Sequence, residues 1–348
     1  MSEMNLGIIG GGQLGSLLSV AAKKLNIKTT IYSDDPDAPA QNFSDDFVFG
    51  NYNDKKKILE FINKVDLITY EFENIPFDTL NEINKLKKVL PKPSVNRLIQ
   101  HRLAEKDFVN KLNIRTTRYV SIEKKSDIET LEDFLPGILK TTTMGYDGKG
   151  QYPIKKITDL DNLNLDFSKG YVLEKLVKLK KEISVIITRF GNNNYGIYEP
   201  IENTHQDQIL NHSKIPAEIS KKILEQSTEW ATTIAEELKY IGTLCVEFFI
   251  DRNENLYVNE IAPRVHNSGH LTINAYNVSQ FENHVRAVCS LDKIPLKKLS
   301  NAKMINLIGN QIEPYRQNFQ FKDNEFFFDY LKKEIKEKRK MGHITTLI

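Results

Sequence analysis

Cysteine is scarce in this sequence, which has Cys245 and Cys289 alone among 348 residues and no Cys-x-x-Cys pair. The scarcity excludes a disulfide scaffold and a zinc-ribbon site, and it favours a reducing cytoplasm. Long apolar runs are also missing: no stretch approaches 18 residues, and the start, MSEMNLGIIG, lacks the basic segment of a signal peptide. A net charge of +2 gives no reason to expect a polyanionic partner. We therefore expect a soluble cytoplasmic protein that binds neither membrane nor nucleic acid.

The N-terminal segment carries a glycine-rich turn between a strand and a helix. Asn5 to Ile9 reads as a strand, Gln13 to Leu25 as an amphipathic helix and Thr29 to Tyr32 as a second strand. Between the first two lies Gly10-Gly11-Gly12-Gln13-Leu14-Gly15, a formal GxGxxG. This predicts a Rossmann-like parallel sheet in an α/β protein, and it leaves NAD(P) binding open, because such a turn binds many anions.

A second group of charged residues follows the next predicted strand, Asp66 to Tyr70. Glu71 and Glu73 come directly after it, where parallel sheets usually bind ligands. Prolines 91 and 93 indicate a domain boundary near residue 95. The helix expected over Asn96 to Leu112 carries Arg97, Arg102 and Lys106, and three basic residues on a helix are usually a solvated face.

A third feature is a glycine-studded loop between the predicted strands 137–140 and 151–154. The first strand ends in Lys140, and the loop reads Gly145-Tyr146-Asp147-Gly148-Lys149-Gly150 before Gln151. Glycines allow a backbone to approach phosphates closely and lysines supply charge, so we interpret the loop as a lid over a nucleoside triphosphate. An ordinary hairpin tip is the alternative.

The strongest signal is a predicted β-hairpin over residues 242–262. Two apolar runs, Leu244 to Ile250 and Leu256 to Ile261, flank a polar turn. If the turn is symmetric about Asn253-Glu254, Glu247 lies directly opposite Glu260, where like charges destabilise a sheet. A Mg²⁺ ion shared with phosphate oxygens would resolve this conflict. A half-exposed hairpin with both acids in water stays open.

Polar clusters flank this hairpin along the chain. Arg264, His266 and Asn267 follow Glu260 closely and are suited to bind an oxyanion and orient a small substrate. His205 lies in a predicted polar loop, 203–207, where a lone histidine is more often structural. The cationic run 332–340 is usually a solvated tail, although it could also bind a phosphate.

Together these motifs resemble the ATP-grasp superfamily and, within it, the family of 5-(carboxyamino)imidazole ribonucleotide synthases. The resemblance runs nearly end to end, through GGGQLG at 10–15, ExE at 71–73, GYDGKGQ at 145–151, NEIAPRVHNSGH at 259–270 and RKMGH at 339–343. It implies a Rossmann-like domain over residues 1–95, an ATP-grasp domain over 96–290 with a lid at about 113–177, and a C-terminal domain over 291–348. It also implies a homodimer, with ATP, bicarbonate and aminoimidazole ribonucleotide as substrates in purine biosynthesis and Mg²⁺ as cofactor.

The resemblance assigns a role to each matching residue. Glu247 and Glu260 would carry Mg²⁺, and bicarbonate or carboxyphosphate would be surrounded by Arg264, His266, Asn267 and Lys149. The ribonucleotide would contact Gly12, Gln13, Glu73, Tyr146, Lys333, Arg339 and Lys340. The residues implied to bind ATP are Arg102, Lys140, Gly145, Tyr146, Asp147, Gly148, Lys149, Gly150, Gln151, Glu174, Lys175, Leu176, Val177, Glu182, His205, Asn259 and Glu260. Upstream of RKMGH, Lys336-Glu337-Lys338 departs from a common Arg-Pro-Gly, so the register of the phosphate-binding lysines is not fixed.

Three other functions stay open at this point. A sister ATP-grasp enzyme would join a different carboxylate to an amine. An NAD(P) oxidoreductase built on residues 10–15 would leave residues 140–270 without a role, and a non-catalytic nucleotide-binding module would release no phosphate.

Overall fold

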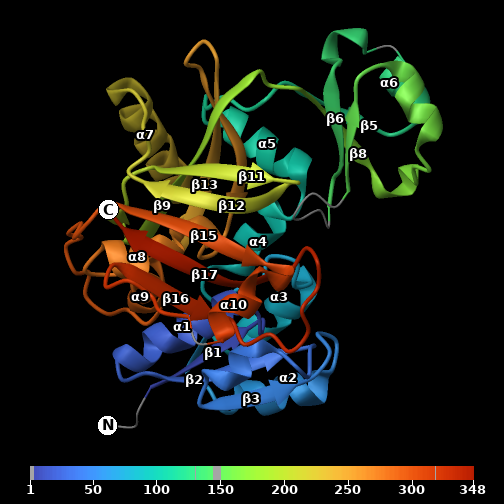
Figure 1. The fold of residues 1–348 in the computed structure, drawn as a ribbon. Helices are drawn as coiled ribbons and strands as arrows, with labels where there is room; N and C mark the ends of the chain where they lie inside the picture. The colour runs from blue at the N-terminus through green and yellow to red at the C-terminus, as the bar shows by residue number, and fades with distance from the viewer. Residues whose placement is uncertain (1–3, 130, 144–149, 318) are drawn as a thin grey trace.

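The computed structural model describes residues 4–129, 131–143, 150–317 and 319–348. Three sheets organise this part of the chain: a parallel sheet near the N-terminus, a small antiparallel sheet that projects to one side, and a long antiparallel sheet between them (Figure 1). Among the described residues, no helix is long and apolar enough to cross a membrane.

The N-terminal sheet has the strand order β3-β2-β1-β4, with parallel pairing throughout. Its apolar strands are buried, with Leu6 and Ile8 of β1 fully inaccessible to solvent. The predicted first strand is confirmed, and helix α1 ends one residue before the predicted Leu25. The elements are β1 (Asn5–Ile9), α1 (Gln13–Lys24), β2 (Lys28–Ser33), β3 (Asp46–Phe49), α2 (Lys55–Ile62), β4 (Leu67–Tyr70) and α3 (Phe77–Leu86).

The helix expected over Asn96 to Leu112 is wrong as a single element. The chain forms two helices, α4 (Pro93–Ile99) and α5 (Arg102–Lys111), separated at Gln100 and His101. The Gln100 side-chain amide donates to the carbonyls of Glu73 and Ile75, and His101 adopts an extended conformation whose ring caps α5. These tertiary contacts turn the chain and bring the start of α5 beside the large sheet.

The projecting sheet carries the segment expected to form the lid. Its strand order is β5-β8-β6-β7, all antiparallel, and Figure 1 shows it standing off the rest of the molecule with α6 (Lys125–Glu129) on its outer side. The strands are β5 (Tyr119–Ile122), β6 (Gly137–Thr141), β7 (Gln151–Ile154) and β8 (Tyr171–Lys175). Residues 145–149 of the predicted loop lie outside the described residues.

The large sheet has the strand order β14-β13-β9-β11-β12-β15-β17-β16, with β10 also paired to β9. Helices α7 (Lys221–Glu237) and α9 (Gln280–Val288) pack on it; Ile223 and Ile234 of α7 share a buried core with Val246 of β13. The strands are β9 (Leu179–Gly191), β10 (Asn194–Ile197), β11 (Ile201–Gln206), β12 (Ile209–Ile215), β13 (Gly242–Asp251), β14 (Leu256–Ala262), β15 (Ala302–Ile308), β16 (Glu325–Asp329) and β17 (Lys340–Leu347). The remaining short helices are α8 (Thr272–Ala275) and α10 (Glu313–Arg316).

One feature of this sheet differs from the prediction made from the sequence, and a second concerns the C-terminal strands, whose pairing the sequence did not predict. The polar segment 203–207 was expected to be a loop, which is wrong, because Asn203 to Gln206 belong to β11 and pair with β12. The C-terminal strands β15, β17 and β16 form no sheet of their own, because β15 pairs with β12 and extends the central sheet. Strand β15 therefore lies directly beside β12.

Candidate active site

Glu247 and Glu260 face each other across the β13–β14 hairpin, as predicted, but for a different reason. From Ile250↔Leu256 to Phe248↔Val258 the pairing is symmetric about Asn253 alone, and not about Asn253-Glu254. The register then shifts by one residue between Glu247 and Phe248, which leaves Asn259 as an extra residue and sets Glu247 opposite Glu260. A β-bulge therefore places both carboxylates on one face of the sheet.

The electrostatics of this pair fit a divalent cation. Burial and the Glu260 charge raise the pKa of Glu247 to about 8. On the other side, Arg102 of α5 lies 3.5 Å from the Glu260 carboxylate, and burial together with Glu260 raises the pKa of neighbouring Glu105 to about 8. Three carboxyl groups thus crowd one place, and two of them resist ionisation. A cation held by Glu247 and Glu260 would relieve this crowding, and two carboxylates with substrate phosphates form a donor set that Mg²⁺ accepts.

A buried cluster of charges joins the projecting sheet to helix α5. The Glu174 carboxylate on β8 lies 3.1 Å from the Lys140 ammonium on β6 and 3.3 Å from the Lys106 ammonium on α5, and it accepts a 2.9 Å bond from Thr117. Burial opposes the charge on Glu174, but the two lysines outweigh it and lower its pKa to about 2. Lys106 and Arg102 are buried, at 2% and 9% exposure, so the predicted solvated face is wrong for these two residues. Arg97, on α4, is exposed as expected.

His205 and Glu182 meet on neighbouring strands at the far side of the site. Nδ1 of His205 on β11 lies 2.6 Å from the Glu182 carboxylate on β9. Burial lowers the pKa of His205, but the bond to Glu182 and its charge outweigh burial and raise the pKa overall. His205 and Glu182 thus form an ion pair between the neighbouring strands β11 and β9.

The loop after β14 brings Arg264 and His266 against acids from two different sheets. Arg264 forms an ion pair with Glu73, at the end of β4 in the parallel sheet. Burial opposes the charge on Arg264, whereas Glu73, Glu71 and Glu260 raise its pKa. His266 Nε2 lies 3.1 Å from Glu247 Oε1, and burial together with the Arg264 charge lowers the pKa of His266 well below its usual value. The loop after β14 thus contacts both the acid Glu73 after β4 and the acid Glu247 on β13.

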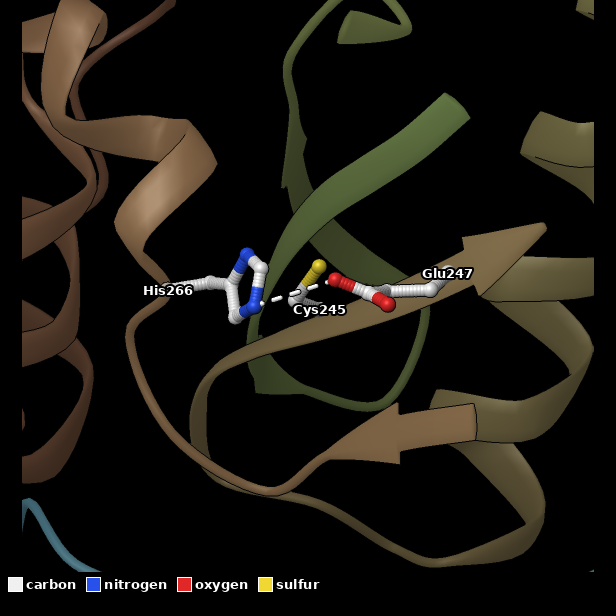
Figure 2. Close-up of side chains that lie close together, drawn as sticks. All are labelled: Cys245, Glu247 and His266. Carbon is white, nitrogen blue, oxygen red and sulfur yellow. Dashed lines mark ion pairs between the residues drawn. The ribbon is translucent and has the colours of Figure 1, made fainter. Parts of the chain in front are cut away.

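Figure 2 shows the His266 ring and the Glu247 carboxylate pointing toward each other, with the Cys245 sulfur beside them. One ligand atom from each of these three side chains lies within 4.8 Å of the others. Cys245 is buried, and burial raises the pKa of its thiol well above the usual value. Nearby, both amide atoms of Asn267 are buried without a hydrogen-bond partner in the described part of the chain. A bound ligand would satisfy them.

The glycine-rich turn is occupied by the protein's own carboxylate. The Gly12 amide donates to Glu71 Oε1 at 2.7 Å, and a Cβ added to Gly10, whose φ is +105°, would lie 2.7 Å from that same oxygen. In dinucleotide-binding folds this amide faces a phosphate. Glu71 therefore takes the position that a pyrophosphate needs, which argues against NAD(P) binding here.

The C-terminal cationic run reaches this turn through Lys332. The Lys332 ammonium donates to Gln13 Oε1 at 2.9 Å and to the Lys340 carbonyl at 2.6 Å. Lys333, which the sequence favours, instead forms an ion pair with Asp37 and is largely exposed. The Arg339 guanidinium donates to the Glu334 carbonyl. The structure thus brings Lys332, and not Lys333, to Gln13.

The remaining predicted residues fall into two groups. Gly145, Tyr146, Asp147, Gly148 and Lys149 lie outside the described residues. Gly150 follows them, and Gln151 pairs with Lys140 in the projecting sheet. Lys175 ends β8, and Leu176 and Val177 lie between it and β9. Sequence reasoning assigned no site role to Glu105 or Lys106, and it included Lys332 only as part of the cationic run 332–340. For Lys106 the one available signal was its spacing from Arg102, which puts both on one face of α5.

Comparison with known proteins agrees with this geometry. Three family models match successive parts of the chain: a ribonucleotide synthetase preATP-grasp domain at residues 3–100, an ATP-grasp domain at 107–281 and a phosphoribosylaminoimidazole carboxylase C-terminal domain at 302–348. The fold and the site define an ATP-grasp enzyme, an ATP-dependent ligase.

The relatives narrow this class. The chain is 37% identical to N5-carboxyaminoimidazole ribonucleotide synthase of Bacillus subtilis over 98% of its own length and 90% of that protein, and 38% identical to the enzyme of that name from Staphylococcus aureus strain MRSA252, over 98% and 92%. This chain belongs to the N5-carboxyaminoimidazole ribonucleotide synthase family. Among solved structures, the Staphylococcus aureus synthetase complexed with ADP matches with a TM-score of 0.93 at 36% identity, covering 99% of this chain and 93% of that one. The Aspergillus clavatus synthase in complex with ADP and 5-aminoimidazole ribonucleotide matches at 0.90 and 25% identity, covering 99% and 94%.

Proposed function

We propose that this chain uses ATP and bicarbonate to carboxylate the exocyclic amine of 5-aminoimidazole ribonucleotide, releasing ADP and phosphate in purine biosynthesis. The observation that carries the proposal is the meeting of three groups in one place: the opposed acids Glu247 and Glu260, the Arg264 and His266 loop, and the crevice at the end of β4. Family membership supports the same reaction.

The nucleotide binds between the lid and the large sheet. Lys140 supplies positive charge to the phosphates, and the ion pair with Glu174 holds the Lys140 ammonium in place. Arg102, fixed against Glu260, faces the same phosphates, while Glu182 and His205 lie on the sheet surface, suited to the ribose. Residues 150–151 and 174–177 are proposed as further ATP contacts, together with Asn259 beside Glu260. Residues 145–149, outside the described part of the chain, are proposed to bind ATP as well.

The chemistry begins when a bicarbonate oxygen attacks the γ-phosphorus and ADP leaves, which gives carboxyphosphate. Arg264 and Asn267 bind the developing negative charge, because a guanidinium and the unpaired Nδ2 amide group of Asn267 can donate hydrogen bonds to an oxyanion where water is largely excluded. Lys149 would add a further positive charge. Carboxyphosphate then divides into CO₂ and phosphate. The ribonucleotide amine attacks CO₂ and loses its proton, and the closed lid keeps water from the intermediate.

The ribonucleotide binds in the crevice between the parallel sheet and the C-terminal strands. Gly12, Gln13 and Glu73 would contact it from one side, and Tyr146, which lies outside the described residues, is proposed as a further contact. Lys332, Lys340 and Arg339 supply positive charge for the ribonucleotide phosphate, with Lys332 taking the place that the sequence gave to Lys333.

Glu247 and Glu260 would hold Mg²⁺. When bound, Mg²⁺ offsets charge on the ATP phosphates as phosphoryl transfer proceeds. The chain's part is to keep two carboxylates opposed at the bulge, with one steadied by His266 and the other by Arg102.

A phosphate-release assay tests the proposal. Carboxylated product should form only when ATP, bicarbonate and 5-aminoimidazole ribonucleotide are all present. Phosphate release should stop when ATP or bicarbonate is omitted. Release that another amine or carboxylate supports better would point to a different ATP-grasp ligase. The proposal also includes a cytoplasmic site of action, supported by two free buried cysteines, and a homodimer, which sedimentation equilibrium would test.

A further inference from the structure

A chain of buried polar side chains leads from His266 across the large sheet. Ser268 Oγ lies 2.9 Å from His266 Nδ1, and Ser184 Oγ on β9 lies 2.8 Å from Ser268 Oγ. Asn203 on β11 donates from Nδ2 to Ser184 Oγ at 2.9 Å, and Ser213 on β12 donates to Asn203 Oδ1 at 2.9 Å. All four of these residues are buried. Such a network is costly to bury unless each member is satisfied.

One contact fixes the direction of the whole chain. The backbone N–H of Ser268 donates to His266 Nδ1 at 3.3 Å, and a backbone N–H can only donate. Nδ1 is therefore an acceptor, so a neutral ring carries its proton on Nε2, which faces Glu247 Oε1 at 3.1 Å. This amide favours the Nε2–H tautomer. The Ser268 hydroxyl reinforces it only while its own proton points to Nδ1, and that orientation depends on Ser184 and the residues beyond it.

The hydroxyl protons then follow in order. Because Nδ1 has no proton, the Ser268 hydroxyl donates to it and must accept from Ser184. The Ser184 hydroxyl, in turn, accepts from the Asn203 amide and is free to donate to Ser268. Ser213 completes the order by donating to the Asn203 carbonyl oxygen, so every hydroxyl proton along this path has an acceptor.

We propose that Ser268, Ser184, Asn203 and Ser213 are positioning residues that hold His266 as its neutral Nε2–H tautomer. His266 then donates its single Nε2 proton, to Glu247 in this structure and to an oxyanion when carboxyphosphate fills the pocket, and it does not act as a base. This role for the pocket rests on the proposed function, whereas the tautomer itself does not.

The same geometry argues against a transition-metal site at Cys245, Glu247 and His266 (Figure 2). A histidine that binds a metal through Nε2 carries its proton on Nδ1 and donates it to an acceptor. Here Nδ1 meets the Ser268 N–H, so an Nδ1 proton would face another donor.

The first experiment reads the tautomer directly. Long-range proton–nitrogen NMR spectra of the metal-free, full-length protein, labelled with ¹⁵N-histidine, are recorded at neutral pH, and His266 is assigned by its loss in H266Q. We expect an unprotonated Nδ1 and a protonated Nε2. A protonated Nδ1 would overturn the proposal. This result needs no activity, so it stands apart from the success or failure of the proposed reaction.

The second experiment removes one relay hydroxyl that does not touch His266. S184A should populate the other tautomer and lower kcat/KM for bicarbonate about fivefold to tenfold, the value of one lost hydrogen bond. S227A is the matched control, because Ser227 on α7 is equally buried and bonds only to Leu224 in the same helix. It should leave both readouts unchanged. An S184A protein with the wild-type tautomer contradicts the relay, whatever its rate; if S184A does not fold, S213A at the far end of the relay should move the tautomer in the same direction.

Discussion

Glu247 and Glu260 are directly opposed because Asn259 is an extra residue in β14. Without that bulge, Glu247 would pair with Asn259, and Glu260 would point to the other face of the sheet, because side chains alternate along a strand. A β-bulge thus brings the two acids together, and it leaves Asn259 without a partner residue on β13. This is expected where a site, and not the sheet, dictates the register.

Removing either opposed acid should abolish magnesium-dependent turnover. E247Q and E260Q each lose one of two carboxylates, and we expect kcat to fall about a thousandfold, since a catalytic metal supplies several kcal/mol. Steady-state rates across a magnesium titration measure the effect. E254Q, in the turn of the same hairpin, is the control and should match wild type. Near-normal turnover of E247Q would remove the metal assignment.

The stability of the metal-free protein should fall as pH rises from about 6 to 8. A Glu247 carboxyl group ionises near 4.5 when unfolded but keeps its proton to about 8 when folded. Between these values the folded state binds more protons, so the free energy of unfolding decreases with rising pH. Thermal unfolding in EDTA should show a steeper decline for wild type than for E247Q. Parallel curves would mean that Glu247 ionises normally.

Glu174 should be essential for the stability of the lid junction. E174Q leaves the ammonium groups of Lys106 and Lys140 buried beside a neutral amide, and breaking a buried ion pair costs about 3–5 kcal/mol. Urea denaturation measures the free energy of unfolding. E218Q, which breaks the exposed pair of Glu218 with Lys214, should change it little. Equal effects of the two variants would refute the structural importance of the buried cluster.

Substitution of Lys332 should raise KM for 5-aminoimidazole ribonucleotide far more than substitution of Lys333. K332M removes the ammonium that reaches Gln13, and we expect KM for 5-aminoimidazole ribonucleotide to rise about tenfold, the value of one charge-assisted bond. K333M removes an exposed ion pair with Asp37 and should leave KM near wild type. Initial rates at varied ribonucleotide concentration decide between them. The reverse order would restore the register that the sequence suggests.

Much of the site could be predicted from sequence because its parts are local. The hairpin, the acids after β4 and the Arg264 loop follow from short patterns of apolar and charged residues. The bulge at Asn259 could not be predicted, because a turn symmetric about Asn253-Glu254 would give the same Glu247–Glu260 pair without it.

Burial was the other unpredictable factor. Lys106 looks like any solvated lysine until β8 brings Glu174 against it from 68 residues away. The break at Gln100 depends in the same way on the carbonyls of Glu73 and Ile75. His205 lies on a strand because β12 pairs with it, although its neighbours are polar.

The most direct test of the central claim is phosphate release with each substrate omitted in turn. We predict that phosphate release depends on both ATP and bicarbonate. We also predict that 5-aminoimidazole ribonucleotide is converted to its N-carboxylated product in step with ADP formation. Release that proceeds equally well without bicarbonate would contradict it.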